Sequence, residues 1–501
     1  MAPPKLSIRG RRRARAGAGA LALLALASGC SLAPIYAKPS LAMPDAYAET
    51  GLWRKAQPGD HLDRGPWWEL FHDPGLDDLE SQVEGANPSV AAAVANFHAA
   101  RAAVRQAGAG YFPVLTMDPA ASLGTLRAPA GNAGPAQAAT VQAQYSLPFD
   151  AAWEPDLWGR VGNAVKASRY EAVAVAGDLD NVRLTVHAEV AEDYFQLRGL
   201  DIQQGLLDGE ISAAQDALDL ARAQAAGGLA SGQDVAQANA LLDAARAQAT
   251  ELSLQHALLD HALAALLGQP AASYPLLSGA AQTLPVTLPA GVPSQLLERR
   301  PDVAAAERRV AEANAQIGVA RAAYFPAFTL DGSAGFMSST LGALLSGPSF
   351  VWSVGGDLAQ TLFDGGKRAA ATDQALAVYQ ATVANYRQTV LAAFQEVEDG
   401  LAGTRLLTQE LEQQKAATKA SRALLDMAKA RYQAGLDPYA SVIAARNAWM
   451  DSQGADSVLA SRQMTASVQL IKALGGGWTP AADPDQADGP VPSEAAETPE
   501  R

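Results

Sequence analysis

Apolar and polar residues alternate with a period of two in two short stretches of this chain. In residues 141–147, Val, Ala, Tyr and Leu are separated by two Gln and a Ser; in residues 350–355, Phe, Trp and Val are separated by Val, Ser and Gly. Such alternation is typical of a strand with one apolar and one polar face. We expect two β-hairpins, and so four strands per chain. They span 114–158, with a turn at 128–138, and 327–363, with a loop at 341–349.

The longest uninterrupted pattern is helical. No proline occurs between Pro155 and Pro270, and Ala, Leu, Gln, Arg, Asp and Glu dominate this stretch. These residues lose little free energy on entering a helix. Only the glycine-containing segment 226–231 interrupts the stretch, so we expect a hairpin of two helices over 159–268. The first helix would be about 100 Å long at about 1.5 Å per residue, which is too long for the core of a compact domain.

The same pattern occurs twice. A chain of two copies is indicated because matching residues keep a constant separation over well-spaced points. The separation is 213 residues before the strands and 207 after them, which leaves a difference of six residues in the β-hairpin. The matching groups are Tyr111-Phe112-Pro113 with Tyr324-Phe325-Pro326, Glu189-Val190 with Glu396-Val397, Gly228-Leu229 with Gly435-Leu436, and Leu267-Gly268 with Leu474-Gly475.

This duplication predicts the organisation of the chain. Each copy contains a helix, two strands and a long helical hairpin, and the helix is expected over 87–110 in the first copy and over 300–323 in the second. The expected segments are a signal peptide at 1–29, an arm and equatorial segment at 30–85, a first repeat at 86–270 with its helical hairpin at 159–268, a linker at 271–298, a second repeat at 299–478 with its helical hairpin at 366–475, and a disordered acidic Pro/Ala-rich tail at 479–501.

Composition and charge exclude several classes of function. Hydrophobic residues make up 49% of the chain and aromatic residues only 6%, and the excess is alanine, which suits closely packed helices. The formal charge is −14, although six basic residues are concentrated in positions 5–15. Nucleic acid is therefore not an expected partner, because phosphate binding needs a basic face. No apolar run after residue 30 is long enough to predict a helix that spans a membrane.

The beginning of the chain has the layout of an export signal. Basic residues at 5–15 precede the small apolar residues 16–27. Cys30 is the only cysteine, so it cannot form a disulfide within the chain. Its place after Ala27-Ser28-Gly29 resembles a bacterial lipoprotein signal, which implies cleavage before Cys30 and acylation of it. Ser31 in place of aspartate implies sorting to the outer membrane. The alternative is a plain secretory signal with an incidental cysteine.

Four strands leave two open edges, and this limits where they can lie. In lipid every backbone polar group must be paired, so several chains would have to complete one barrel. The smallest bacterial barrels have about eight strands, which two chains would supply, but an interior of that size is filled by side chains. Twelve strands leave a passage, so three chains form the smallest assembly that conducts. The alternative is a small soluble sheet at the end of the helices.

Several motifs resemble the TolC-like outer-membrane efflux protein family, in the lipoprotein branch that serves resistance-nodulation-division (RND) pumps. The resemblance covers about residues 30–478. It is most specific at the Arg300-Pro301-Asp302 block and at the Gly-Gly-Gly-Trp sequence of 475–478. The other motifs that carry the resemblance are Cys30-Ser31-Leu32, Trp67-Trp68, Asp73-Pro74, Trp153-Glu154, Asp156-Leu157-Trp158-Gly159-Arg160 and Ala313-Asn314-Ala315-Gln316-Ile317-Gly318.

The resemblance implies an α+β membrane protein that acts as a passive duct. Three copies would form a twelve-stranded barrel in the lipid of the outer membrane, continued by a tunnel of twelve helices in the periplasm. The hairpin tips would contact a periplasmic adaptor protein, which couples the duct to an inner-membrane RND-type pump. The resemblance implies no enzymatic activity, no cofactor and no metal.

The resemblance also implies an aperture at the tip of the second hairpin. Tyr432 and Asp437 match family positions there, Tyr439 lies beside them, and Ala444 replaces an aspartate common in relatives, with Arg446 two residues further on. Asp437 either takes part in the aperture or caps the following helix before its proline. Tyr432 either bonds to a neighbouring helix or packs in the core.

In the first tip, Asp234 also matches a family position. Because Ser231 precedes it, the favoured role of Asp234 is a charge in the first turn of a helix.

Little in the sequence supports a metal site or acid–base catalysis by paired carboxylates. His256 and His261 are five residues apart, which does not put both on one helical face as metal ligation needs. Carboxylate pairs such as Glu189 with Glu192 and Glu396 with Asp399 are interpreted as solvated helix faces or inter-helix ion pairs.

The leading hypothesis is therefore an exit duct for small molecules. The alternatives are a type I protein-secretion duct and a periplasmic coiled-coil lipoprotein with a structural role. Protein-secretion ducts often lack the acylated cysteine and the Gly-Gly-Gly-Trp end, and a scaffold needs no repeated strand pairs with one apolar face.

Overall fold

The computed structural model describes residues 31–40, 48–49, 66–126, 140–274 and 300–476. It divides into two compact units. We call the first the strand unit (residues 1–39, 98–173 and 307–385) and the second the hairpin unit (residues 40–97, 174–306 and 386–501). Each unit takes segments from both sequence repeats, so the two repeats are not two separately packed bodies.

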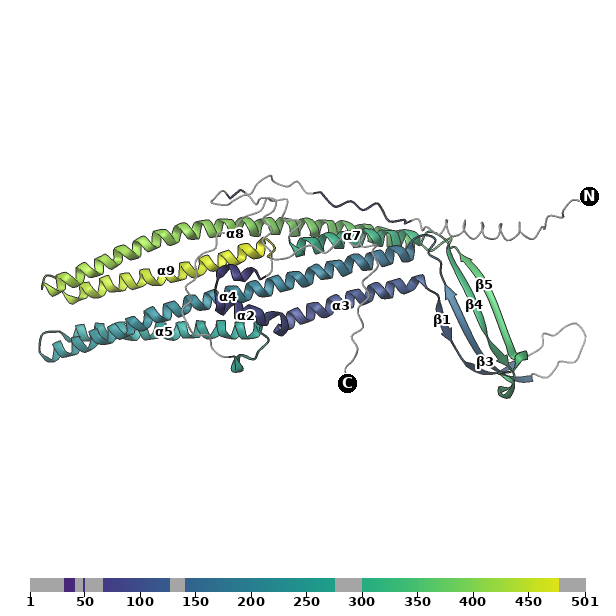
Figure 1. Cartoon of the computed structure of the whole chain (residues 1–501), viewed down its shortest axis with the longest axis horizontal. Helices are drawn as coiled ribbons and strands as arrows, with labels where there is room; N and C mark the ends of the chain where they lie inside the picture. Colours follow the sequence, from purple (N-terminus) through teal and green to yellow (C-terminus); the bar gives the residue numbers. More distant parts are fainter. Residues whose placement is uncertain (1–30, 41–47, 50–65, 127–139, 275–299, 477–501) are drawn as a thin grey trace, which may run out of the picture. The chain divides into compact units, whose positions relative to one another are not determined.

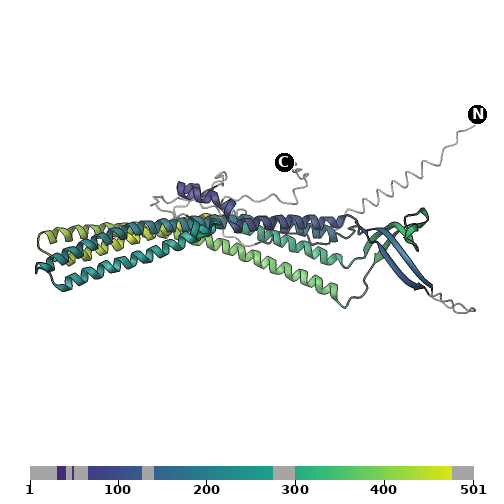
Figure 2. The same ribbon diagram turned by 90° about the horizontal axis from the view of Figure 1, so that it is seen from below.

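The predicted duplication is confirmed by the helices. The long helix α4 (Arg160–Ala226) and its counterpart α8 (Lys367–Gln433) each contain 67 residues. Their returning partners α5 (Gly232–Leu266) and α9 (Tyr439–Ala473) each contain 35 residues. Figures 1 and 2 both show α5 beside α4 and α9 beside α8. The repeats therefore build two helical hairpins of equal size.

The shorter helices follow the same repeat. The predicted helices over 87–110 and 300–323 are confirmed as α3 and α7, with ends within two residues of the expected ones. The remaining short helices lie before the first repeat, between α3 and the first strand, after α5 and in the loop between the last two strands. The elements are η1 (Trp67–Phe71), α2 (Pro74–Ala86), α3 (Pro88–Gly108), η2 (Ala109–Tyr111), η3 (Ala271–Ser273), α7 (Pro301–Ala322), η4 (Leu341–Ala343) and η5 (Gly347–Ser349).

The strand unit contains one antiparallel sheet. Its order is β1-β3-β4-β5, and β2 pairs with β3 on the same side as β1 (Figure 1). Five strands are present in place of the four predicted, because Pro119 interrupts the first one. Both parts keep one register on β3, so they act as one edge strand. The strands are β1 (Val114–Met117), β2 (Ala120–Leu126), β3 (Thr140–Trp153), β4 (Ala327–Ser338) and β5 (Phe350–Ala359).

The interruption has a local cause. Pro119 cannot donate a backbone hydrogen bond, and proline is tolerated at a sheet edge. A second proline, Pro148, lies in β3 and pairs with Gly335 of β4. A Cβ atom on Gly335 would lie 2.2 Å from the carbonyl oxygen of Leu147, so only glycine fits there.

The predicted alternation gives the sheet two different faces. The pairing registers bring Trp352 of β5, Ala334 of β4 and Phe149 of β3 onto the same face. Phe336 and Phe350 also pair across strands, with ring centroids 5.7 Å apart. Trp352 is 70% exposed and Val354 is 79% exposed. The opposite face carries the polar side chains of Gln142, Gln144, Ser146, Asp150, Asp331, Ser333, Ser353 and Asp357.

In the hairpin unit the two hairpins have equivalent cores. Leu218, Ala238 and Leu242 pack together between α4 and α5. The equivalent positions in the second hairpin, 207 residues later, include Leu425 and Ala445, which form the corresponding cluster between α8 and α9. Duplicated sequence has therefore produced duplicated packing, with alanine allowing the helices to approach closely.

A buried contact between Glu80 and His187 holds α2 against α4 in the hairpin unit. The Glu80 carboxylate lies 2.6 Å from Nδ1 of His187, and the ring of Trp68 stacks on the imidazole at 4.5 Å. Glu80 is 1% exposed, and among the described residues its Oε1 has no hydrogen-bond partner. Burial raises the pKa of Glu80 to about 7, against a smaller opposing effect of His187. Asp73 adds a second contact, because it accepts a hydrogen bond from the hydroxyl of Tyr194 at 2.8 Å.

Several predicted segments lie outside the described residues. They are the signal peptide at 1–29 with Cys30, most of the arm, the turn at 128–138, most of the linker and the tail at 479–501.

The Glu80 pair predicts a pH dependence of stability. The pKa of Glu80 is higher in the folded chain than in the unfolded chain, so its favourable contribution is complete below about pH 4.5 and is lost as the pH rises through about 7. Glu80→Gln should therefore raise the free energy of unfolding at pH 8, by about 2 kcal/mol, and have little effect at pH 5. Thermal unfolding followed by circular dichroism at the two pH values measures the difference.

Glu84→Gln provides the control, because Glu84 lies on the same helix and pairs with Arg183 at the surface. An equal effect of Glu80→Gln at both pH values would contradict the assignment.

Candidate functional site at the hairpin tips

The tip of the second hairpin is a tight turn between α8 and α9. The amide of Gly435 donates to the carbonyl of Tyr432 at 2.9 Å, and the amide of Leu436 donates to the carbonyl of Arg431 at 2.9 Å. This pair of bonds ends a helix when the residue after it adopts a left-handed conformation. Gly435 has φ 68°, which glycine adopts without strain. The side chain of Leu436 is 66% exposed.

An ion pair closes this turn. Nε and Nη2 of Arg431 donate to the two carboxylate oxygens of Asp437, at 2.6 and 2.9 Å. A two-bond pairing of this kind fixes the orientation of both groups. The hydrogen bond from Arg431 lowers the pKa of Asp437 below its ordinary value. The carboxylate therefore stays charged in mildly acidic solution.

The alternative in which Asp437 caps the next helix is wrong. Helix α9 begins at Tyr439 and its N-cap position is Pro438, with no side-chain hydrogen bond to the first turn. The carboxylate of Asp437 is instead directed to Arg431. No sequence pattern indicated this partner, because Arg431 belongs to the preceding helix and surface arginines are common in such helices.

Tyr432 and Tyr439 lie together beneath the turn. Their ring centroids are 5.1 Å apart, and both rings pack against the cluster that contains Leu425 and Val442. Tyr432 therefore packs in the core of the hairpin, which was one of the two roles expected for it. Asp437 and the two tyrosines thus occupy one end of the second hairpin.

The first tip has the same backbone turn but a different polar contact. The amide of Leu229 donates to the carbonyl of Gln224 at 2.8 Å, and Gly228 has φ 70°. Ser231 and Asp234 form a capping box at the start of α5, so the predicted first-turn role of Asp234 is confirmed. The Ser231 amide and hydroxyl lower the pKa of Asp234. Leu229 is 84% exposed, so both tips present a leucine to solvent.

Arg446 lies apart from this group of tip residues. It is two turns along α9, and its Nη2 donates to the carbonyl of Gly209 on α4 at 3.2 Å. Ala444, beside it in sequence, is exposed. Arg446 lines a shallow cleft between α4, α5 and α9 together with Glu210 and Tyr439. Burial raises the pKa of Glu210, and Asp451 adds to the effect while Arg446 opposes it. Sequence reasoning missed Glu210, since a single glutamate in a long helix carries no pattern.

The remaining polar clusters have structural roles. His256 lies between Asp201 and Asp260, at 3.1 and 2.8 Å, and so joins α5 to α4. Within the described residues, no group of three or more His, Cys, Asp or Glu side chains has the arrangement of a metal site. None of the helices in the described part of the chain is long and apolar enough to cross a membrane.

Comparison with known proteins places this geometry in context. The family model described as "Outer membrane efflux protein" matches residues 79–269 and 292–476. The toluene efflux pump outer membrane protein TtgF of Pseudomonas putida is 31% identical over 463 residues, which cover 90% of this chain and 95% of that protein.

Two solved structures have a similar fold. The outer-membrane channel OprN is 29% identical with a TM-score of 0.81, over 90% of this chain and 100% of that one. The open state of the Neisseria gonorrhoeae MtrE outer membrane channel is 27% identical with a TM-score of 0.79, over 89% and 98%.

The ion pair between Arg431 and Asp437 should slow hydrogen exchange at the amides of the second tip. Asp437→Asn should leave the thermal midpoint unchanged, since the pair is exposed, but accelerate hydrogen exchange at the amides of Gly435 and Leu436 about two- to five-fold. Asp234→Asn is the matched variant and should accelerate exchange only at Ser231, whose amide donates to Asp234. Exchange measured by NMR or mass spectrometry tests both variants. Unchanged exchange at the second tip in Asp437→Asn would show that the pair does not hold the turn.

The ion pair between Arg431 and Asp437 also predicts that hydrogen exchange at the second tip does not change in mildly acidic solution. Because the pKa of Asp437 is lowered, exchange at Leu436, after correction for its intrinsic pH dependence, should stay constant from pH 7 down to about pH 4. A rise in corrected exchange between pH 7 and about pH 5 would contradict it.

Proposed function

Because this chain belongs to the outer membrane efflux protein family, we propose that three copies of it form a passive exit duct in the outer membrane, through which small molecules leave the cell. The observation that carries the proposal is the sheet of the strand unit, which has one apolar face and two edges without a partner strand among the described residues. The duct performs no chemical reaction.

The apolar face of the sheet is suited to lipid. Large apolar side chains on it are exposed in the single chain, including Leu123, Trp352 and Val354. The backbone groups at the edges, on β1/β2 and on β5, would then have to be paired inside the membrane. If β5 of one copy pairs with the β1/β2 edge of the next copy, all of these backbone groups have partners. Three copies then close a barrel of twelve strands around a passage. The opposite, polar face would line that passage.

The helical hairpins would extend this passage on the periplasmic side. Each copy contributes α4, α5, α8 and α9, so three copies supply twelve long helices. We propose that their tips meet a periplasmic adaptor protein and, through it, an inner-membrane pump of the RND type. The exposed leucines at the two tips, Leu229 and Leu436, offer apolar contacts for such a partner.

We further propose that the second tip forms the aperture of the duct. Arg431 and Asp437 hold its turn in one conformation, and Tyr432 and Tyr439 pack the helices behind it. Arg446 and Asp234 lie on neighbouring helices of the tip region, where they position these helices rather than close the passage.

The N-terminal segment supports a lipid anchor at Cys30. The residue after it, Ser31, donates to the side chain of Asn163 at 2.8 Å, and Asn314 donates to the carbonyl of Pro34 at 2.8 Å. A Cβ atom on Gly318 would lie 2.8 Å from Ala33, so the chain packs closely on α7. These contacts belong to the strand unit, the part that the proposal puts at the membrane. We therefore propose that Cys30 carries acyl chains that insert in the lipid.

Reconstitution in planar lipid bilayers tests the duct. The wild-type protein should give discrete conductance steps of one size, and Asp437→Asn should increase the fraction of time spent open, since it releases the tip turn. Arg462→Lys serves as the control, because Arg462 is an exposed residue of α9 that lies away from the tip. The absence of steps from both the wild type and Asp437→Asn would overturn the proposed function.

Mass spectrometry of the mature protein tests the anchor. The expected N-terminal residue is Cys30 with covalently bound fatty acid, and Cys30→Ser should lack that mass while keeping the contacts of Ser31 with Asn163. A mature protein that begins elsewhere, or an unmodified Cys30, would contradict this part of the proposal.

A further inference from the structure

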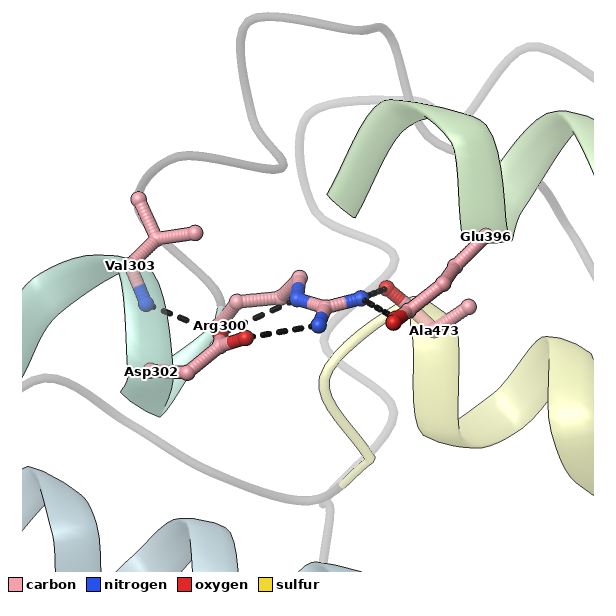
Figure 3. A network of polar contacts seen from close by, with 5 residues as sticks. All are labelled: Arg300, Asp302, Val303, Glu396 and Ala473. Carbon is pink, nitrogen blue, oxygen red and sulfur yellow. Dashed lines mark hydrogen bonds and ion pairs between the residues drawn. The ribbon is translucent and has the colours of Figure 1, made fainter. Parts of the chain in front are cut away.

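At the base of each helical hairpin, a side chain from outside the hairpin donates a hydrogen bond to the end of the returning helix, and the two donors occupy equivalent positions. In the first repeat, Nδ2 of Asn87 donates to the carbonyl of Leu266 at 2.7 Å. In the second, Nη1 of Arg300 donates to the carbonyl of Ala473 at 3.1 Å (Figure 3). Asn87 and Arg300 are 213 residues apart, and the two acceptors are 207 apart. These are the same separations that define the repeat, so the two contacts are the same junction in two copies.

The helix ends that receive these bonds have the same geometry. Gly268, two residues after the end of α5, has φ 64°, and Gly475, two residues after the end of α9, has φ 89°. A Cβ atom on Gly268 would lie 2.1 Å from the carbonyl of Ala86, so the base of the first hairpin packs directly against the end of α2. The last carbonyls of a helix lack partners within the helix and carry its negative dipole end. A donor at this point therefore fixes where the hairpin ends.

The second junction is a network of charged groups. Nε and Nη2 of Arg300 donate to the carboxylate of Asp302 at 3.0 and 2.7 Å, and Nη1 lies 2.5 Å from Glu396 on α8 (Figure 3). Asp302 also accepts a bond from the amide of Val303 in the first turn of α7, at 2.8 Å. One buried guanidinium thus joins the start of α7, the middle of α8 and the end of α9. Lysine could not reach all three, because it lacks the planar arrangement of donors.

The first junction is neutral. Oδ1 of Asn87 accepts bonds from the amides of Ser89 and Val90, at 2.8 and 3.1 Å, and so caps α3. Its Nδ2 makes the single bond to Leu266. The residue of the first repeat that is equivalent to Glu396 is Glu189, which is exposed. The two hairpins are therefore held at their bases by contacts of different strength.

We propose that Arg300 and Asn87 are positioning residues, each of which sets the position of the tip of its own hairpin independently of the other. The returning helices α5 and α9 contain 35 residues each, so a tip lies about 50 Å from its junction. A tilt of about 5° at the base would therefore move a tip by about 4 Å. Small changes at the junction thus become large changes at the tip, and they affect the aperture if the proposed duct is correct.

Electron–electron resonance distances between spin labels test this inference. Leu436→Cys and Leu229→Cys put a label on the second and first tip, and each label reports the distance between copies in the assembled protein. The unaltered chain, labelled in parallel, establishes whether Cys30 takes up the reagent; if it does, all variants carry Cys30→Ser as well.

Arg300→Lys keeps the charge but loses most of the network, and it should shift or broaden the distance at position 436 by about 3–5 Å while leaving position 229 unchanged. Asn87→Asp keeps the cap of α3 but cannot donate to Leu266. It should have the opposite effect, with a change at 229 and none at 436. Arg462→Lys, at an exposed position of α9 in the second hairpin, should change neither.

Equal changes in the distances at positions 229 and 436 in either variant would show that the substitution loosens both hairpins. This result would overturn the inference. A folded Arg300→Lys protein with an unchanged distance at position 436 would also overturn it. If the wild-type protein gave no distance between copies, the proposed three-copy duct would fail instead. In that case the distance between labels at positions 229 and 436 of the same chain tests the inference. Arg300→Lys and Asn87→Asp should each change this distance, and an unchanged distance in the folded variants would contradict the inference.

Discussion

The constraint on which the structure depends is the pairing of backbone hydrogen-bonding groups at the edges of the sheet. Each chain builds four strand positions, with one apolar face and two edges that have no partner strand within the residues that the structure describes. An apolar face of this size is unsuited to water, and an open edge is unsuited to lipid. Pairing with neighbouring copies of the chain would satisfy both conditions at once. The proposed assembly thus rests on the sheet.

The duplication has given the chain two hairpins of equal length and equivalent cores. The two hairpins differ, however, in the contacts that hold their bases. The same position holds asparagine in the first repeat and arginine in the second, so a single hydrogen bond holds one base and a charged network holds the other. The tips differ in the same way, since Ser231 and Asp234 cap the first and Arg431 pairs with Asp437 at the second. The two hairpins therefore differ in the polar contacts at both of their ends, although their cores are equivalent.

Features that depend on periodicity or on repetition could be predicted from the sequence. The alternation over 141–147 and 350–355 identified the strands and their apolar face, and the separation of 207 residues identified both hairpins and their turns. The break of the first strand at Pro119 was not predicted, although a proline within a strand indicates an edge or an interruption. Contacts between distant residues were the main omission. Neither the pairing of Asp437 with Arg431 nor the network of Arg300 leaves a periodic signal, because each joins residues from different segments of the chain.

The central claim is that neighbouring copies share one wall by pairing the first edge strand of one with β5 of the next. Disulfide cross-linking in the outer membrane tests it most directly, with one cysteine at Thr116 on β1 and a second scanned along β5 from Val351 to Asp357. The account predicts covalent dimers and trimers and no larger species, with cross-linking confined to β5 positions that share one register. Cross-linking only within a single chain, or a ladder that continues beyond three copies, would contradict it.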